Sequence, residues 1–77
     1  MQKVKTKTNM LKARRVQYDY SQTDVAEELD MTMTTYGKKE RGDLDFSQSE
    51  IYTLKNLLHL TNDEVFEFFF SDLLPMC

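Results

Sequence analysis

Three threonines and three cations lie close together in one short segment of this 77-residue chain. They are Thr32, Thr34, Thr35, Lys38, Lys39 and Arg41. Hydroxyl groups donate and accept hydrogen bonds, and ammonium and guanidinium groups attract anions. If the segment is a helix, the free N–H groups of its first turn attract anions as well. The combination indicates contact with a nucleic acid, and a helix cap followed by a solvated basic face is the plainer reading.

Side chains in this segment are also of the kinds that read base edges. Met33 can contact a thymine methyl group, and Lys38, one turn beyond Thr34, can reach guanine or a phosphate. The major groove of DNA is about 12 Å wide and admits one α-helix. We therefore expect residues 33–41 to form a helix that faces a nucleic acid.

Other candidate chemistry in the chain is sparse. His59 has no Cys, Asp or second His beside it, which favours a structural role. Cys77 lacks a neighbouring base and is a poor nucleophile. We interpret the acidic residues Glu27, Glu28, Asp43 and Asp45 as solvated groups. The sequence thus predicts no enzyme, no metal site, no cofactor and no small-molecule ligand.

Charge is distributed unevenly along the chain, which carries a net charge of −3. Residues 1–18 carry six cations and no acid, whereas residues 43–77 carry seven acids and the single cation Lys55. Such asymmetry suggests a polyanionic partner for the basic part, and a solubilising basic arm would explain it equally well.

Apolar spacing and capping residues predict an all-α fold of five short helices without strands. The helices are expected at about residues 10–18, 22–29, 33–41, 48–58 and 62–70. The expected N-caps are Asn9, Ser21, Thr32, Ser47 and Thr61, and Asp24, Glu50 and Glu64 are expected to complete capping boxes. Asp30 is expected in the left-handed conformation, and Gly42 is expected to end the third helix.

Length and composition predict a single domain. We expect a flexible basic arm at residues 1–8 and a compact domain at residues 9–74, with a helix-turn-helix at residues 21–42. The chain shows neither an apolar signal segment near its start nor a stretch long enough to span a membrane, so we expect a cytoplasmic protein.

Residues 10–70 resemble the lambda-repressor-like, Cro/Xre-type helix-turn-helix domains. The matching residues are Ser21-Gln22, Val25-Ala26-Glu27-Glu28-Leu29, Met31-Thr32 and Glu40-Arg41-Gly42. Later stretches, among them TYGKKERG and LTNDEVFEFFF, resemble a subgroup found among short phage and prophage regulators. The resemblance covers about four-fifths of the chain and implies a compact five-helix DNA-binding domain.

The resemblance also implies roles for individual residues. The positions expected to contact bases are Met33, Thr34 and Lys38. The positions expected to contact the DNA backbone are Gln22, Thr32, Thr35, Lys39, Arg41 and Arg15. Three residues depart from the common pattern: Asp30 replaces a turn glycine, Gly37 replaces a side chain that often reaches a base, and Arg14 replaces a buried aliphatic residue.

The last predicted helix carries more apolar surface than one small core needs. Val65, Phe68 and Phe69 share one face, and Phe66, Phe70 and Leu73 form a second stripe. Because exposed aromatic patches mark interfaces, we expect the second stripe to form a homodimer interface, with packing by the C-terminal tail as the other possibility.

Together these features predict a sequence-specific transcriptional regulator, a Cro-like repressor of phage type that binds a palindromic double-stranded DNA operator as a dimer. The alternative is an antirepressor that uses the same fold to bind another phage regulator protein. Asp30, Gly37 and the aromatic last helix would suit that alternative better than they suit DNA.

Overall fold

The computed structural model describes residues 8–70, which form five α-helices. They are α1 (Thr8–Gln17), α2 (Gln22–Glu28), α3 (Met33–Glu40), α4 (Gln48–Leu57) and α5 (Asn62–Phe70). No strand occurs within this range, and the predicted all-α fold is confirmed. One detail is wrong: α1 begins at Thr8, so Asn9 lies inside the helix instead of at its N-cap.

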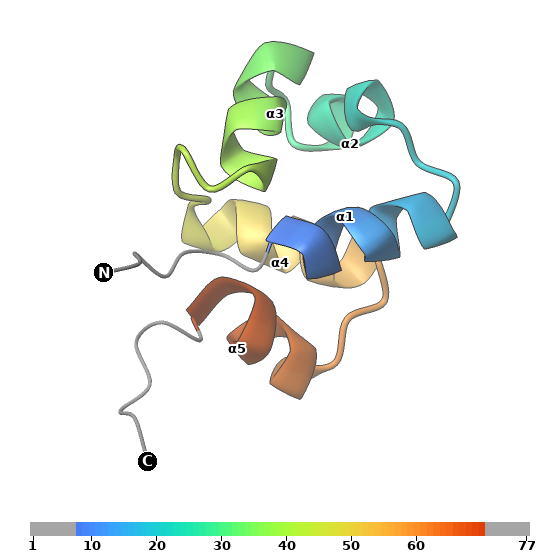
Figure 1. Cartoon of the computed structure of the whole chain (residues 1–77), viewed down its shortest axis with the longest axis vertical. Helices are drawn as coiled ribbons and strands as arrows, with labels where there is room; N and C mark the ends of the chain where they lie inside the picture. The colour runs from blue at the N-terminus through green and yellow to red at the C-terminus, as the bar shows by residue number, and fades with distance from the viewer. Residues whose placement is uncertain (1–7, 71–77) are drawn as a thin grey trace.

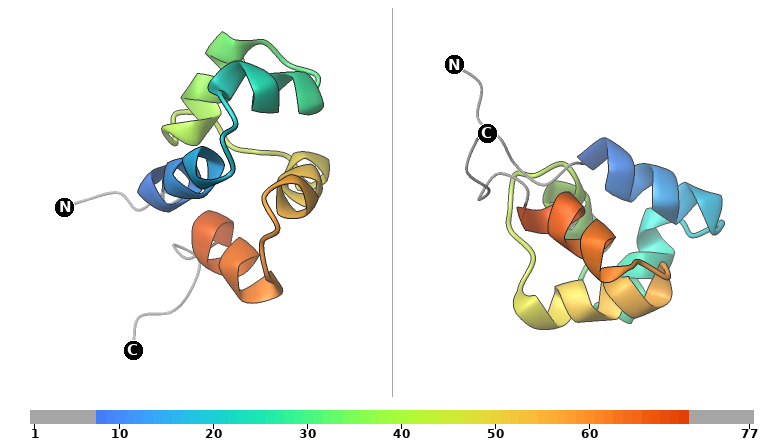
Figure 2. Two further views of the ribbon diagram at one scale, coloured as in Figure 1. Left: turned by 90° about the vertical axis from the view of Figure 1, so that its right-hand side faces the viewer. Right: turned by 90° about the horizontal axis from the view of Figure 1, so that it is seen from below.

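The helices are arranged along the longest axis of the molecule (Figure 1). α2 and α3 pack together at one end, α5 lies at the other end, and α1 and α4 lie between them (Figure 1). α1 contacts both α3 and α5, and α4 contacts α5 (Figure 2). This arrangement leaves one side of α3 facing away from the rest of the domain.

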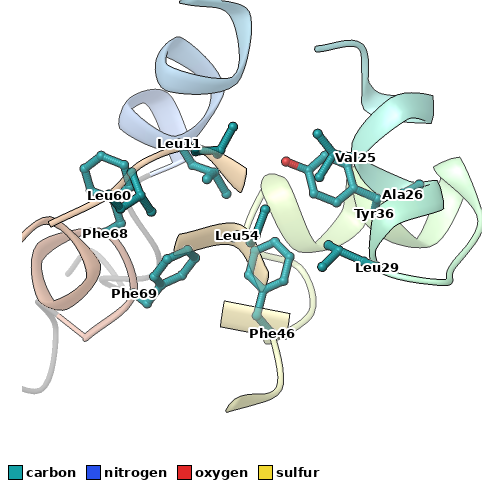
Figure 3. Packing of buried hydrophobic residues seen from close by; sticks show 11 residues of the cluster. Leu11, Val25, Ala26, Leu29, Tyr36, Phe46, Leu54, Leu60, Phe68 and Phe69 are labelled. Atoms are coloured by element: carbon teal, nitrogen blue, oxygen red, sulfur yellow. The ribbon is translucent and has the colours of Figure 1, made fainter. Parts of the chain in front are cut away.

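A single hydrophobic core joins all five helices (Figure 3). Its buried members are Leu11, Val25, Ala26, Leu29, Tyr36, Phe46, Leu54, Leu58, Leu60, Phe68 and Phe69. Phe46, from the loop before α4, packs edge-on against Phe69 with ring centroids 5.5 Å apart and lies 6.0 Å from the ring of Tyr36. The loop after α3 is therefore anchored in the core by an aromatic side chain.

Capping boxes begin three of the helices, as predicted. The hydroxyls of Ser21 and Ser47 accept hydrogen bonds from the third residue of α2 and α4, and the carboxylates of Asp24 and Glu50 accept the N-cap N–H in return. Thr61 and Glu64 form the same pair of hydrogen bonds, 2.9 Å and 3.0 Å long, at the start of α5. These side chains satisfy N–H groups that would otherwise lack a partner at each helix start.

Each of the helices α1, α2, α3 and α4 is ended by one residue in the left-handed conformation. The residues are Asp19 (φ 63°), Asp30 (φ 59°), Gly42 (φ 88°) and His59 (φ 55°). In each case the next residue's N–H bonds to a carbonyl five residues earlier, for example Met31 to Ala26 at 3.0 Å and Asp43 to Lys38 at 2.8 Å. This is the Schellman pattern, which turns the chain sharply. The predictions for Asp30 and Gly42 are confirmed.

Two further predictions concern chain ends. The basic arm predicted for residues 1–8 lies outside the described residues except for Thr8, and Leu73 of the predicted dimer interface lies outside them too. Among residues 8–70, no helix has the length and apolar character needed to cross a membrane.

Candidate nucleic-acid interface

α3 divides its residues sharply between the core and the surface. Tyr36 and Glu40 are buried, whereas Met33 is 51% exposed and Thr34 and Lys38 are exposed. Thr34 and Lys38 lie four residues apart and so share one side of α3, and Met33 lies beside Thr34 about 100° around the helix. The structure thus brings together the three side chains that were predicted to contact bases.

The first turn of α3 is held by a pair of threonines. The Thr32 hydroxyl accepts a hydrogen bond from the Thr35 N–H at 3.2 Å and donates one to the Thr35 hydroxyl at 3.1 Å. Thr32 is thus the N-cap that the sequence predicts. Both hydroxyls serve the local structure, and Thr34 between them is exposed.

Behind this surface, Glu40 accepts four hydrogen bonds from three helices. Arg15 of α1 donates from Nε at 2.8 Å and from Nη2 at 3.3 Å. Gln22 of α2 donates from Nε2 at 2.9 Å, and the Tyr36 hydroxyl of α3 donates at 2.8 Å. We call these four side chains the Glu40 cluster. It fixes the helix-turn-helix against α1 through charge-assisted hydrogen bonds.

Protonation states in the Glu40 cluster follow from these contacts. Burial raises the pKa of Glu40, but hydrogen bonds from Arg15, Gln22 and Tyr36 outweigh burial, so the pKa of this carboxyl lies below its ordinary value. Burial, followed by the negative charge of Glu40, raises the pKa of the Tyr36 hydroxyl far above its ordinary value. Glu40 is therefore ionised, and Tyr36 keeps the proton that it donates to Glu40.

Arg15 lies in a different place from the one that a phosphate contact requires. Its side chain is buried, with the residue only 7% exposed, and Nη1 also donates to the Tyr20 carbonyl at 2.8 Å. The structure therefore argues against the predicted contact between Arg15 and the DNA backbone. The Arg15 guanidinium instead compensates the buried charge of Glu40, and loss of either partner would leave the other charge buried and unpaired.

Lys39 is likewise engaged within the domain. Its ammonium lies 2.7 Å from a carboxylate oxygen of Glu50 and 5.9 Å from the centroid of the Phe46 ring. Glu50 is also the capping residue of α4, so the ion pair ties α3 to the start of α4. This geometry argues against the predicted backbone contact by Lys39.

Gln22 and Arg41 remain near the exposed side of the helix-turn-helix. Gln22 is half-buried at the first position of α2, and its hydrogen bond to Glu40 orients the amide group. Arg41 is exposed and forms an ion pair at the surface with Asp43, with Nε and Oδ2 3.3 Å apart. Both side chains are placed where they can donate hydrogen bonds to a phosphate.

Asp30 and the last helix match the features that favoured a protein partner. Asp30 is exposed in the turn between α2 and α3. Phe66 is 46% exposed, and its ring lies 6.1 Å from that of the half-buried Phe70. The exposed Phe66 ring and the Phe70 ring, which also packs against the core, form an aromatic patch on α5 that we call the Phe66 patch.

Besides the Glu40 cluster, a second set of long-range contacts joins the helices and was not predicted from the sequence. It is centred on Arg14. This side chain forms an ion pair with Glu64, donates to the Leu58 carbonyl at 3.4 Å and lies 5.9 Å from the centroid of the Phe68 ring. Glu64 was recognisable as a capping residue, but nothing in the local sequence indicates its distant partner. The i, i+4 spacing of Tyr36 and Glu40 was a signal that could have been found.

Within residues 8–70, no three His, Cys, Asp or Glu side chains lie close enough together to hold a metal ion. His59 lies beside Tyr18 with ring centroids 5.1 Å apart, in the connection between α4 and α5. It ends α4 in the left-handed conformation, which accords with a structural role.

Comparison with known protein families shows which family contains this helix-turn-helix. A family model described as helix-turn-helix matches residues 11–64, which include α2, α3 and the Glu40 cluster. No curated protein and no solved structure was found to be significantly similar to the chain. The family model covers well over half of the sequence and corresponds to DNA-binding regulators with an all-α domain. The chain therefore belongs to the Cro/C1-type helix-turn-helix family, which is lambda-repressor-like.

Proposed function

We propose that the protein is a transcriptional repressor that binds a palindromic operator as a homodimer, with α3 in the major groove. Met33, Thr34 and Lys38 read base edges, whereas Thr32, Thr35, Gln22 and Arg41 position the protein on the backbone. A dimer places two copies of α3 in successive major grooves about 34 Å apart. Repression follows when the bound dimer occludes a promoter.

The observation that carries this proposal is the exposed side of α3. A short, capped helix presents Met33, Thr34 and Lys38 to solvent, with the apolar Met33 next to two groups that can form hydrogen bonds. The opposite side is fixed by Tyr36 in the core and by Glu40 in its cluster. A rigidly supported, exposed helix with these side chains suits direct contact with base edges.

The Phe66 patch supports the dimer. Its rings are apolar and partly exposed, and they lie on α5, at the opposite end of the molecule from α2. In a two-fold dimer the same patch on each subunit would meet itself. Aromatic side chains are enriched in such interfaces.

Titration of a labelled duplex tests the function directly. We expect the wild-type protein to bind duplexes selected from a random-sequence pool and to protect a palindrome from nuclease. Affinity should fall with salt concentration, with a log–log slope of about −0.9 for each phosphate neutralised. Failure to bind any duplex at low ionic strength would refute the proposal.

A second candidate function is recognition of another regulator protein. The exposed Asp30 beside α3 and the Phe66 patch favour it, because an acidic group repels phosphate and an aromatic patch attracts proteins. The same titration separates the two functions. A protein-binding regulator would show weak DNA binding without a protected palindrome.

A further inference from the structure

Gly37 occupies an unexpected place inside α3. A glycine within a helix destabilises it by about 0.5–1 kcal/mol relative to alanine. The left-handed conformation that justifies Gly42 does not occur at Gly37, which has helical geometry. Conformation therefore gives no reason for a glycine at this position, and the space around it decides how large a side chain it could carry.

Two polar side chains converge on that space. If Gly37 had a Cβ atom, it would stand 3.5 Å from Nη1 of Arg41 and 3.7 Å from Oε1 of Gln22. These distances are ordinary van der Waals contacts, so a methyl group would fit and a longer side chain would have to displace a neighbour. Gly37 itself is buried although it lies on a short surface helix.

The two side chains approach from different directions. Gln22 is held from behind by Glu40, which accepts a hydrogen bond from Nε2 at 2.9 Å. Arg41 follows α3 and is held on its Nε side by Asp43, which leaves Nη1 directed over Gly37. The Arg41 guanidinium and the second N–H of the Gln22 amide nitrogen, which lies 3.9 Å from the same Cβ position, can both donate to one phosphate group.

We propose that Gly37 is a positioning residue: its missing side chain provides the place in which the Arg41 guanidinium lies beside the Gln22 amide, so that the two act as one phosphate clamp. This inference rests on the proposed DNA-binding function and adds a specific role for a residue that contacts no base. It predicts that size at position 37 controls whether Arg41 contributes to DNA affinity.

A double-mutant cycle tests the proposal. Arg41→Ala is measured in the wild type, in Gly37→Ala and in Gly37→Leu, with a labelled mixed-sequence duplex at two salt concentrations. In the wild type and in Gly37→Ala, we expect Arg41→Ala to weaken binding about tenfold and to reduce the salt slope by about one phosphate. In Gly37→Leu, where Arg41 is already displaced, the same substitution should have almost no effect.

The effect of Arg41→Ala in the wild type, in Gly37→Ala and in Gly37→Leu decides whether Gly37 positions Arg41. A leucine that merely collided with the DNA would weaken binding but leave the tenfold effect of Arg41→Ala intact, which would refute the role of Gly37. Circular dichroism confirms folding of each variant, and Gly37→Gln replaces Gly37→Leu if the leucine variant unfolds. If the wild-type protein bound no duplex, the proposed DNA-binding function would be refuted. If Arg41→Ala weakened binding equally in all three backgrounds, only the role of Gly37 would be refuted.

Discussion

Lys38 and Thr34 are the side chains whose loss should affect DNA recognition most directly. Both lie on the exposed side of α3, so their truncation leaves the core unchanged. We expect Lys38→Ala and Thr34→Ala each to reduce operator affinity by about 1–3 kcal/mol. The measurement is titration of the selected operator duplex at fixed salt concentration.

Matched controls for these two variants lie on α4. Lys55→Ala removes the same charge and Thr53→Ala the same hydroxyl, and neither residue belongs to the exposed side of α3. If Lys38→Ala and Thr34→Ala bind the operator as tightly as these controls, the assignment of the base-contacting residues is wrong.

Glu40 is the charged residue whose substitution should clearly damage stability, because it is buried in an ion pair. Glu40→Gln leaves the buried Arg15 without a compensating charge, and removal of one partner from a buried ion pair costs about 3–5 kcal/mol. We expect a loss of this size in the free energy of unfolding, measured by urea denaturation. Glu27→Gln makes the same chemical change at an exposed position of α2 and should stay within about 0.5 kcal/mol of the wild type.

A similar stability of the two variants would contradict the role assigned to the Glu40 cluster. The cluster would then be an incidental arrangement of side chains, and the orientation of α3 would depend on apolar packing alone.

At the scale of the helices, the two glycines of the chain should respond to alanine in opposite ways. Gly37 has helical geometry and room for a methyl group, so Gly37→Ala should stabilise the protein by about 0.5–1 kcal/mol. Gly42 ends α3 at φ 88°, where a side chain is strained, so Gly42→Ala should destabilise by about 1–3 kcal/mol.

Thermal unfolding measures both changes. For a domain of this size, each kcal/mol shifts Tm by about 4–8 °C. Each glycine serves as the control for the other, because the chemical change is identical. Shifts of the same sign would mean that the backbone geometry of α3 or of its C-terminus differs from the structure described above.

The capping boxes of α4 and α5 have a second use that links helices. Glu50 caps α4 and pairs with Lys39 of α3, and Glu64 caps α5 and pairs with Arg14 of α1. One carboxylate therefore begins a helix and fixes its position relative to another. Local and long-range structure should be lost together when such a carboxylate is protonated.

For the whole molecule, this coupling predicts acid sensitivity. The hydrogen bond from Arg14 is the main cause that lowers the pKa of Glu64; for Glu40 and Glu50, burial acts in the opposite direction and is outweighed by hydrogen bonds and nearby positive charge. A carboxylate with a lowered pKa in the folded state stabilises fully above its unfolded pKa and loses that contribution as pH falls through the folded value.

We therefore expect constant carboxylate-dependent stability well above the ordinary pKa of 4.5, and a progressive decline below it. Thermal unfolding at a series of pH values measures this decline. Glu40→Gln should show a shallower decline than Glu27→Gln, because it lacks one of the three titrating groups. Stability that rose on acidification would contradict the ionised state assigned to all three carboxylates.

Assembly is the second property of the whole molecule. Phe66→Asp introduces a charge into the Phe66 patch at a position that is already 46% exposed, so the fold should survive. We expect sedimentation to show monomers for this variant and dimers for the wild type. Tyr52→Asp, on the exposed face of α4, is the control for an added charge at an exposed aromatic residue. An unchanged dimer in Phe66→Asp would show that α5 does not form the interface.

Much of the fold was accessible from the sequence because its signals are local. A cap and its partner lie three residues apart, and the left-handed residues Asp30 and Gly42 each follow the C-cap residue of the helix that they end. The apolar spacing of α2, α4 and α5 likewise depends on neighbouring turns. The exposed side of α3, and with it the candidate site, follows from the same periodicity.

Only the tertiary structure decided what the remaining charged residues do. Arg15 lies 25 residues from Glu40, and Arg14 lies 50 residues from Glu64, so no local pattern pairs them. From the sequence, Arg15 and Lys39 look like exposed cations; folding instead pairs each with a carboxylate and covers most of its side chain. The spacing of residues along the chain determined where helices begin and end, and the packing of those helices determined which cations remain free to meet DNA.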